Sequence, residues 1–146
     1  MRKATVILIA AIYVASIVIV GVFGLKALIY TESKPITDII LQPIDGHVPE
    51  LNTNGKGYWV ITTYKEGLYI PIEFIPMPAD SQSEIEVTIK DQTGTEEEPT
   101  AELVHDIGYF LKFYRVGTVT VTIQSLDNKK FSKKIDITAY QVPTGN

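Results

Sequence analysis

The hydrophobic pattern divides the chain into two parts. Residues 4–24 contain no charged side chain and form an unbroken apolar run, whereas residues 85–89, 119–123 and 135–139 alternate apolar with polar side chains. A long apolar run is typical of a helix in lipid, and strict alternation is typical of half-buried antiparallel strands. The pattern therefore predicts a single N-terminal helix followed by a β domain.

The apolar run is long enough to cross a bilayer. As a helix it extends over roughly 32 Å, and the hydrocarbon core of a bilayer is about 30 Å thick. Arg2 and Lys3 precede it, so the positive-inside rule predicts a cytoplasmic N-terminus and a β domain outside the cell. A cleaved signal peptide usually has a shorter apolar region, which ends in small residues. We therefore expect an uncleaved, single-pass anchor over residues 1–30, with Tyr30 at the outer interface. Residues typical of the anchor are Ala4, Ile12, Val18 and Phe23.

A second interpretation places the helix in the core of a surface filament, as in type IV pilins. Ala11 and Ala15 are four residues apart and Gly21 follows, and small residues at such spacing let helices approach closely in lipid. Bacterial pilins of this type usually carry a glutamate near the start of the mature helix. This chain has no acidic residue before Glu32. The anchor is therefore the first interpretation, and the filament subunit is the alternative.

The remainder of the chain predicts a β-sandwich over residues 36–146, after a joint at 31–35 whose Pro35 ends the helix. Asp127 and Asn128 predict a hairpin between the last two strands, and Lys65–Gly67 a hairpin between two earlier ones. Pro76 and Pro78 are expected to end a strand. This many short strands in so few residues favours two packed sheets. The expected strands are 36–42, 58–64, 68–75, 85–89, 101–104, 109–114, 119–123 and 135–139.

Three stretches carry a resemblance to a known family. They are "ITDIILQP", "LYIPIEFIPMPADSQSEIEVTI" and "AELVHDIGYFLKFYRVGTVTVTIQSLDNKKFSKKIDITAY". Their order of strands and turns resembles the bacterial immunoglobulin-like domains of group 2, with Pro43, Pro76, Gly108 and Gly117 in the family's proline and glycine places. The family's Trp-Ser-Ser tract is absent, and residues 44–64 are an additional segment. The resemblance implies an all-β, Ig-like sandwich after the transmembrane helix.

Charge and composition exclude several kinds of site. Residues 31–146 hold all 17 acidic residues but only 10 of the 13 basic ones, which argues against a nucleic-acid surface. The chain has no cysteine, so disulfides and thiolate metal sites are excluded. The basic cluster at 129–134 lies in the predicted final hairpin. It either keeps a sheet edge soluble or binds phosphate or lipid.

Candidate chemistry is sparse, and we expect no catalytic, cofactor or metal site. His105 and Asp106 are adjacent, so strand geometry would point them to opposite faces. Glu96–Glu98 near Asp91 could offer oxygen ligands to Ca²⁺, but they lack the spacing of a calcium loop. The strand at 109–114 carries more aromatic residues than one inward face needs, so part of it could be a contact patch. The candidate patch residues are Phe110, Tyr114 and Trp59.

These observations predict a membrane-anchored surface protein whose Ig-like domain serves structural, adhesive or complex-accessory interactions. The expected partners are the lipid bilayer and either another protein or a second copy of the chain.

Overall fold

The computed structural model describes residues 2–29 and 34–145, and for residues 2 and 21–29 it describes the backbone alone. The chain forms two compact units, residues 1–33 and 34–146. Tyr30 and most of the joint expected at 31–35 lie outside the described residues. The chain as a whole is not all-β, because a long helix precedes the strands.

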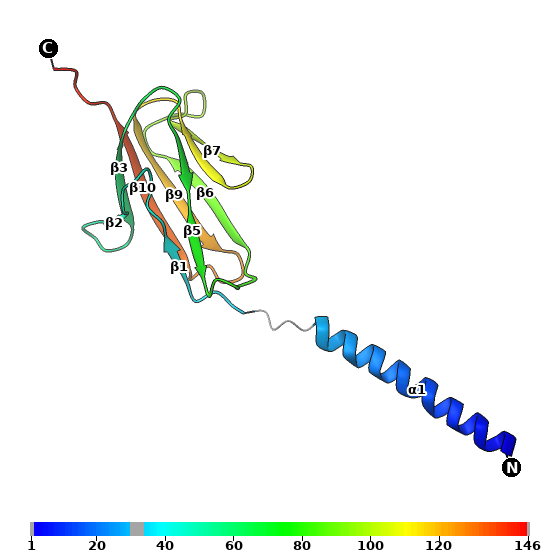
Figure 1. Ribbon diagram of the computed structural model, residues 1–146. Helices are drawn as coiled ribbons and strands as arrows, with labels where there is room; N and C mark the ends of the chain where they lie inside the picture. The colour runs from blue at the N-terminus through cyan, green and yellow to red at the C-terminus, as the bar shows by residue number, and fades with distance from the viewer. Residues whose placement is uncertain (1, 30–33, 146) are drawn as a thin grey trace. The chain divides into compact units, whose positions relative to one another are not determined.

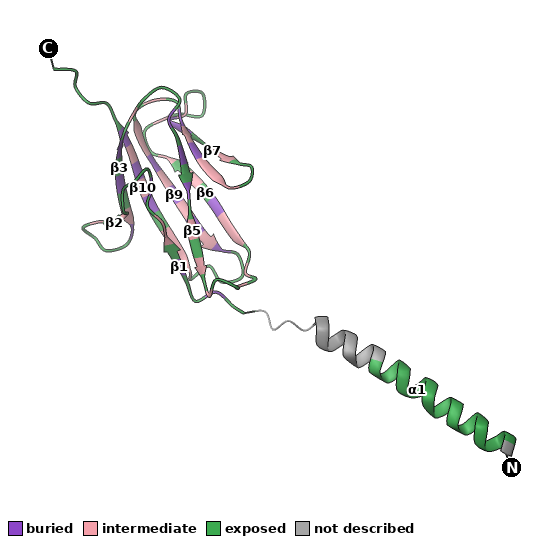
Figure 2. Ribbon diagram, in the orientation of Figure 1, coloured by how far each residue is buried: buried purple, intermediate pink, exposed green. Residues whose placement is uncertain are grey.

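Helix α1 (Arg2–Ile29) is largely apolar, with no charged residue from Ala4 to Leu25. Figure 2 shows its described side chains exposed. Residues 3–20 are all exposed, and Lys3–Val20 has a mean hydropathy of 2.4. It is the one helix among the described residues that is long and apolar enough to cross a membrane. Its length and composition suit a membrane anchor or a signal sequence.

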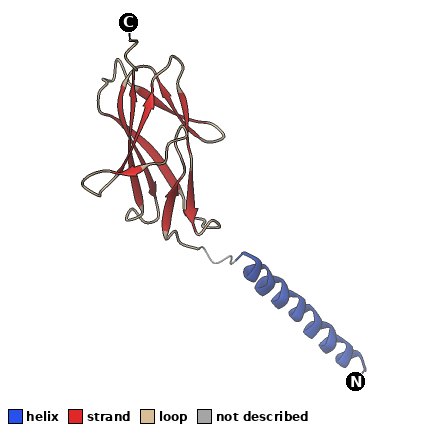
Figure 3. Cartoon of the chain, turned by 60° about the vertical axis from the view of Figure 1, so that its left-hand side comes forward, coloured by secondary structure: helices blue, strands red, loops and turns tan. Residues whose placement is uncertain are grey.

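The second unit is built of strands alone (Figure 3). Six antiparallel pairings and one parallel pairing, between β3 and β10, connect them. The strands are β1 (Asp38–Leu41), β2 (Glu50–Leu51), β3 (Tyr58–Thr63), β4 (Tyr69–Ile72), β5 (Phe74–Met77), β6 (Ile85–Asp91), β7 (Ala101–His105), β8 (Tyr109–Phe113), β9 (Gly117–Ser125) and β10 (Ser132–Tyr140).

The strands make a sandwich-like arrangement of two layers. One layer is a five-stranded sheet in the order β2-β3-β10-β9-β6. The other combines the pair β1-β5 with the sheet β4-β8-β7, because only Glu73 separates β4 from β5. In Figure 1, β1 and β5 lie in front of the five-stranded sheet, and the chain enters and leaves the domain at opposite ends.

The core lies between the two layers and follows the predicted alternation. Val119, Val121 and Ile123 of β9 are fully buried, while the threonines between them face outward. Ile135 and Ile137 of β10 are buried in the same way, so the predicted strand phase is confirmed. The opposite layer contributes mainly Ile39, Ile70, Leu111 and Phe113.

The predicted hairpin at Lys65–Gly67 is wrong. A turn does form there, since the Leu68 N–H donates to the Lys65 carbonyl at 3.0 Å. However, β3 pairs in parallel with β10, and β4 pairs with β8 in the other layer. The turn therefore carries the chain between layers, which a local turn signal cannot distinguish from a hairpin. The final hairpin, β9 to β10, is confirmed.

The expectation that Pro76 ends a strand is wrong, because Pro76 lies within β5 opposite Ile39. The strand ends at Met77, directly before Pro78. The Gln42 N–H donates to the Glu73 carbonyl, which makes Gln42 and Glu73 a hydrogen-bonded pair. Such pairs alternate along an antiparallel ladder, so Ile39 and Pro76 form a pair without hydrogen bonds and the ladder loses nothing. Pro71 of β4 has the same place opposite Phe110. Each proline removes one N–H donor from the strand edge that faces away from its partner strand. The missing donor discourages pairing of that edge with another chain.

Candidate interaction surfaces

The outer face of the β4-β8-β7 sheet carries an aromatic surface. The ladder register aligns Pro71 with Phe110 and Val104, and Tyr69 with Lys112 and Glu102. The alternate residues of these strands, such as Leu111, point to the other face of the sheet and are buried in the core. The aromatic surface therefore consists of Tyr69, Pro71, Glu102, Val104, Phe110, Lys112 and Tyr114.

Specific contacts hold these side chains in place. The rings of Tyr69 and Phe110 stack with centroids 4.9 Å apart and planes 16° apart. The Tyr114 hydroxyl donates to Glu102 Oε2 at 2.6 Å, and Lys112 Nζ lies 5.2 Å from the Tyr114 ring centroid. The hydrogen bond to Glu102, with smaller effects of burial and of the carboxylate charge, raises the pKa of Tyr114. Tyr114 is a neutral donor at neutral pH, as tyrosine ordinarily is.

The aromatic surface remains partly accessible. Because the rings of Tyr69 and Phe110 stack on each other, each ring has one face already covered. Tyr69 and Tyr114 are still 47% and 44% exposed. A cavity of about 560 Å³ adjoins the surface and is lined by Tyr114, Arg115 and Glu98 among others. Exposed tyrosine and arginine are the residues that most often anchor protein interfaces.

Phe110 and Tyr114 thus share one face, but Trp59 lies on β3 in the other layer. There it lines a separate groove of about 390 Å³ formed with the segment that precedes it. Trp59 is 39% exposed, and Val48 is 72% exposed. The three candidate patch residues therefore do not form one patch. The other lining residues of this groove are Gly46, His47, Glu50, Val60 and Ile61.

The structure adds Tyr69 and Pro71 from β4, and Glu102 and Val104 from β7, to the outward residues that alternation predicts on β8. Strand alternation alone predicts which side chains of β8 face outward, and these include Phe110 and, just after the strand, Tyr114. The neighbours of β8 depend on how distant strands pair. The hairpin predicted at Lys65–Gly67 paired residues 68–75 with residues 58–64, whereas β4 pairs with β8. A sequence signal for Tyr69 exists only once β4 is known to pair with β8.

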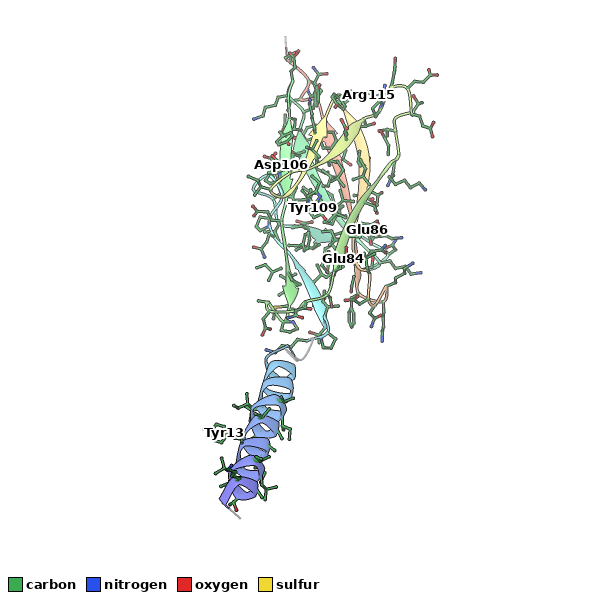
Figure 4. All side chains as sticks on the ribbon, turned by 90° about the vertical axis from the view of Figure 1, so that its right-hand side faces the viewer. Tyr13, Glu84, Glu86, Asp106, Tyr109 and Arg115 are labelled. Atoms are coloured by element: carbon green, nitrogen blue, oxygen red, sulfur yellow. The ribbon has the colours of Figure 1, made fainter. Side chains whose placement is uncertain are left out.

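His105 and Asp106 do not form an acid–base pair. His105 stacks on Tyr109 with ring centroids 4.2 Å apart and planes 9° apart. Asp106 lies in the turn after β7, where its N–H donates to the Gly108 carbonyl at 3.0 Å (Figure 4). A groove of about 500 Å³ beside Tyr109 includes Ile107, which is 99% exposed.

Asp91 fixes the loop that contains the glutamates considered for calcium. Its carboxylate accepts backbone N–H bonds from Thr93 at 3.0 Å, Gly94 at 2.7 Å and Thr100 at 2.5 Å. Burial raises the pKa of Asp91, but these bonds outweigh it and lower the pKa to about 2. Glu98 pairs with Arg115 at 3.2 Å. Among the described residues no group of three or more His, Asp or Glu side chains could hold a metal ion.

The helix offers a third exposed surface. Ala4, Ala11, Ile12, Ala15 and Val18 are all exposed. The Ser16 hydroxyl donates to the Ile12 carbonyl at 2.8 Å, so its hydrogen bond is made within the helix. A polar group satisfied in this way is tolerated in lipid. For Gly21 and Phe23 the structure describes only the backbone, as part of α1.

Comparisons with models of protein families, with curated proteins and with solved structures found no match to this chain.

Proposed function

We propose that the chain is a single-pass membrane protein that displays one Ig-like β-sandwich outside the cell. The domain serves structural, adhesive or accessory contacts with another protein and does not catalyse a reaction. The observation that carries the proposal is the apolar helix, which is exposed over residues 3–20 although the β domain has a core of its own. A helix that is apolar on all sides needs lipid or other helices around it.

The strand order supports an Ig-like domain. In constant-type Ig domains the strands A, B, E and D form one sheet, and C, F and G form the other. The first order corresponds here to β1, then β5 and β4 together as strand B, then β8 and β7. The second order corresponds to β6, β9 and β10. β3 adds a strand parallel to β10. This correspondence also agrees with the resemblance to bacterial immunoglobulin-like domains.

The aromatic surface supports an interaction role. It is the outer face of a sheet, it exposes Tyr69 and Tyr114, and it combines aromatic with charged side chains. Aromatic residues are enriched at protein–protein interfaces relative to the rest of the surface. In this proposal the aromatic surface contacts the protein partner.

A filament subunit is the second candidate function, and Ala11 and Ala15 favour it. Both are exposed, and their spacing of four residues places them on one face of α1. Such a face permits close approach of a second helix in lipid.

Topology can be tested by cysteine labelling, because the chain has no cysteine of its own. Thr63→Cys, on an exposed β3 position, should react in intact cells with a maleimide that cannot cross membranes. A cysteine placed before Arg2 should react only after the cells are lysed. Alkaline extraction should leave both variants in the membrane fraction. Release by alkali, or labelling of Thr63→Cys only after lysis, would contradict the proposal.

A further inference from the structure

One end of the β domain, here called the proximal end, gathers three segments around the point where the chain enters. Lys34 pairs with Asp80, and the Ser81 hydroxyl donates to the Lys34 carbonyl at 3.0 Å. The Leu126 N–H donates to the Glu84 carbonyl at 2.9 Å, which attaches the β9–β10 turn to the same loop. The proximal end therefore comprises residues 34–37, 78–84 and 126–134.

The sheet register places the turn at 126–131 at this end. Ile85, which begins β6, pairs with Ser125 at the end of β9, and Asp91 pairs with Val119 at the opposite end. In Figure 4, Arg115 lies at the end of the domain away from the chain's entrance, and Glu84 lies nearer to that entrance. Chain entry and the basic turn therefore share one end.

The proximal end is the positive pole of an acidic domain. Lys34 pairs with Asp80, and Lys133 pairs with Asp38 at 3.2 Å. Apart from these ion pairs, the proximal end carries three positive charges, on Lys129, Lys130 and Lys134. It carries two negative charges, on Glu84 and Asp127. The distal loops instead carry Glu66, Glu96 and Glu97, and only Lys65 is basic among residues 64–67 and 92–99. Lys129 and Lys130 are exposed, and so is Leu126 beside them.

Covalent geometry limits how far the chain's entry into the domain can be from the last residue of α1. Residue 29 ends α1 and residue 34 begins the described domain, so five peptide units connect them. Five units extend over no more than about 18 Å. Lysines held near an anionic bilayer are attracted to it, and the attraction falls off within a Debye length of about 8–10 Å.

We propose that the proximal end docks on the anionic headgroups of the bilayer in which α1 is anchored, with Lys129 and Lys130 making the contact. This inference rests on the proposed membrane anchorage. The tether keeps the turn at high local concentration near the lipid, so a few lysines suffice to orient the domain. The domain then stands with its acidic loops and C-terminal end away from the membrane.

The test uses the full chain in vesicles, with a fluorophore on Gln82→Cys, an exposed position of the proximal end. The vesicles contain phosphatidylcholine alone, or phosphatidylcholine with about one third phosphatidylglycerol. A headgroup-attached quencher should quench the fluorophore about twofold or more strongly in the anionic vesicles, and salt at about 1 M should abolish the difference. The same fluorophore on Thr63→Cys, at the distal end of β3, should show little change.

Two matched variants decide the role of the lysines. Lys129→Glu with Lys130→Glu should remove the response to anionic lipid, whereas Lys129→Arg with Lys130→Arg should retain it. Lys65→Glu at the distal end should have no effect. An equal response from the Glu and Arg variants, or none in the native chain, would overturn the docking.

Alkaline extraction of the same vesicles separates the two proposals. If the chain resists extraction but the fluorophore does not respond, the docking is wrong and the anchorage stands. If the chain is extracted, both are wrong. Glycerol phosphate at constant ionic strength should not compete with the vesicles. Competition would overturn bilayer docking and assign the turn to a free phosphate compound.

Discussion

Single core side chains should have the largest effects on stability. Val121 is fully buried between the layers, and Val121→Asp would bury an unpaired charge. We expect a loss of roughly 4 kcal/mol or more, against a typical domain stability of about 5–15 kcal/mol. Urea unfolding followed by Trp59 fluorescence would measure it.

The control for this variant is the neighbouring outward residue. Thr122→Asp faces outward on β9 opposite Lys134, so its carboxylate stays hydrated beside a cation. It should change the unfolding free energy by less than about 0.5 kcal/mol. Thr120 is unsuitable, because its hydroxyl donates to Asp136 at 2.6 Å and a second carboxylate there would be repelled. Equal losses at positions 121 and 122 would contradict the assignment of Val121 to the core and of Thr122 to the outer face.

Asp91 should give the domain a defined acid sensitivity. Its pKa is about 2 in the folded state and 3.8 ordinarily, so its stabilisation is present above about pH 4 and is lost as the pH falls through about 2. Asp91→Asn should therefore cost about 1–2 kcal/mol at pH 7, and this difference should shrink toward pH 2. Urea titrations at both pH values would measure it.

The control for Asp91 is Glu97, an exposed residue of the same loop. Glu97→Gln should leave stability nearly unchanged at either pH, because surface carboxylates without fixed partners contribute little. If Asp91→Asn cost the same at pH 2 as at pH 7, the amide bonds to Asp91 would not depend on its charge.

At the scale of elements, the β domain should fold without the helix. Among the residues whose side chains the structure describes, those of the core lie between residues 36 and 139, and none belongs to α1. Residues 34–146 produced alone should therefore be soluble and show one cooperative unfolding transition in circular dichroism. Their midpoint in urea should equal that of the full chain in detergent. An unfolded or aggregated fragment would show that the helix contributes to the fold.

Sequence pattern predicted the elements better than it predicted their neighbours. Alternation identified the buried phase of β9 and β10 because each side chain's direction follows from its own strand. Pairing depends on residues far apart in the chain, such as Val60 beside Ile137, and no local signal encodes it. Phe110 and Tyr114 could therefore be predicted as outward, but their separation from Trp59 could not.

At the scale of the whole molecule, the helix sequence distinguishes a tether from an assembly element. Replacing residues 4–24 with a leucine-rich span of equal length should leave membrane insertion and domain folding intact, because a tether requires length and hydrophobicity alone. Cell fractionation and thermal unfolding of the β domain would measure both.

The companion variant is Ala11→Leu with Ala15→Leu, which keeps the helix apolar but blocks close approach of a second helix. If α1 is a tether, the chain should behave as the native one in native-detergent size analysis. Loss of a polymer or of a co-purifying protein, with insertion intact, would favour the filament or complex instead.

The parallel pairing of β3 with β10 also has a mechanical consequence. The chain enters the domain at one end and leaves it at the other, so tension between residues 34 and 140 pulls β10 along its own axis (Figure 1). The six residues of β10 paired with β3, Ile135–Tyr140, would then be loaded together in shear and not opened one at a time. Forced unfolding depends on the unfolding barrier, so this geometry should make the domain resist stretching more than its equilibrium stability alone would suggest.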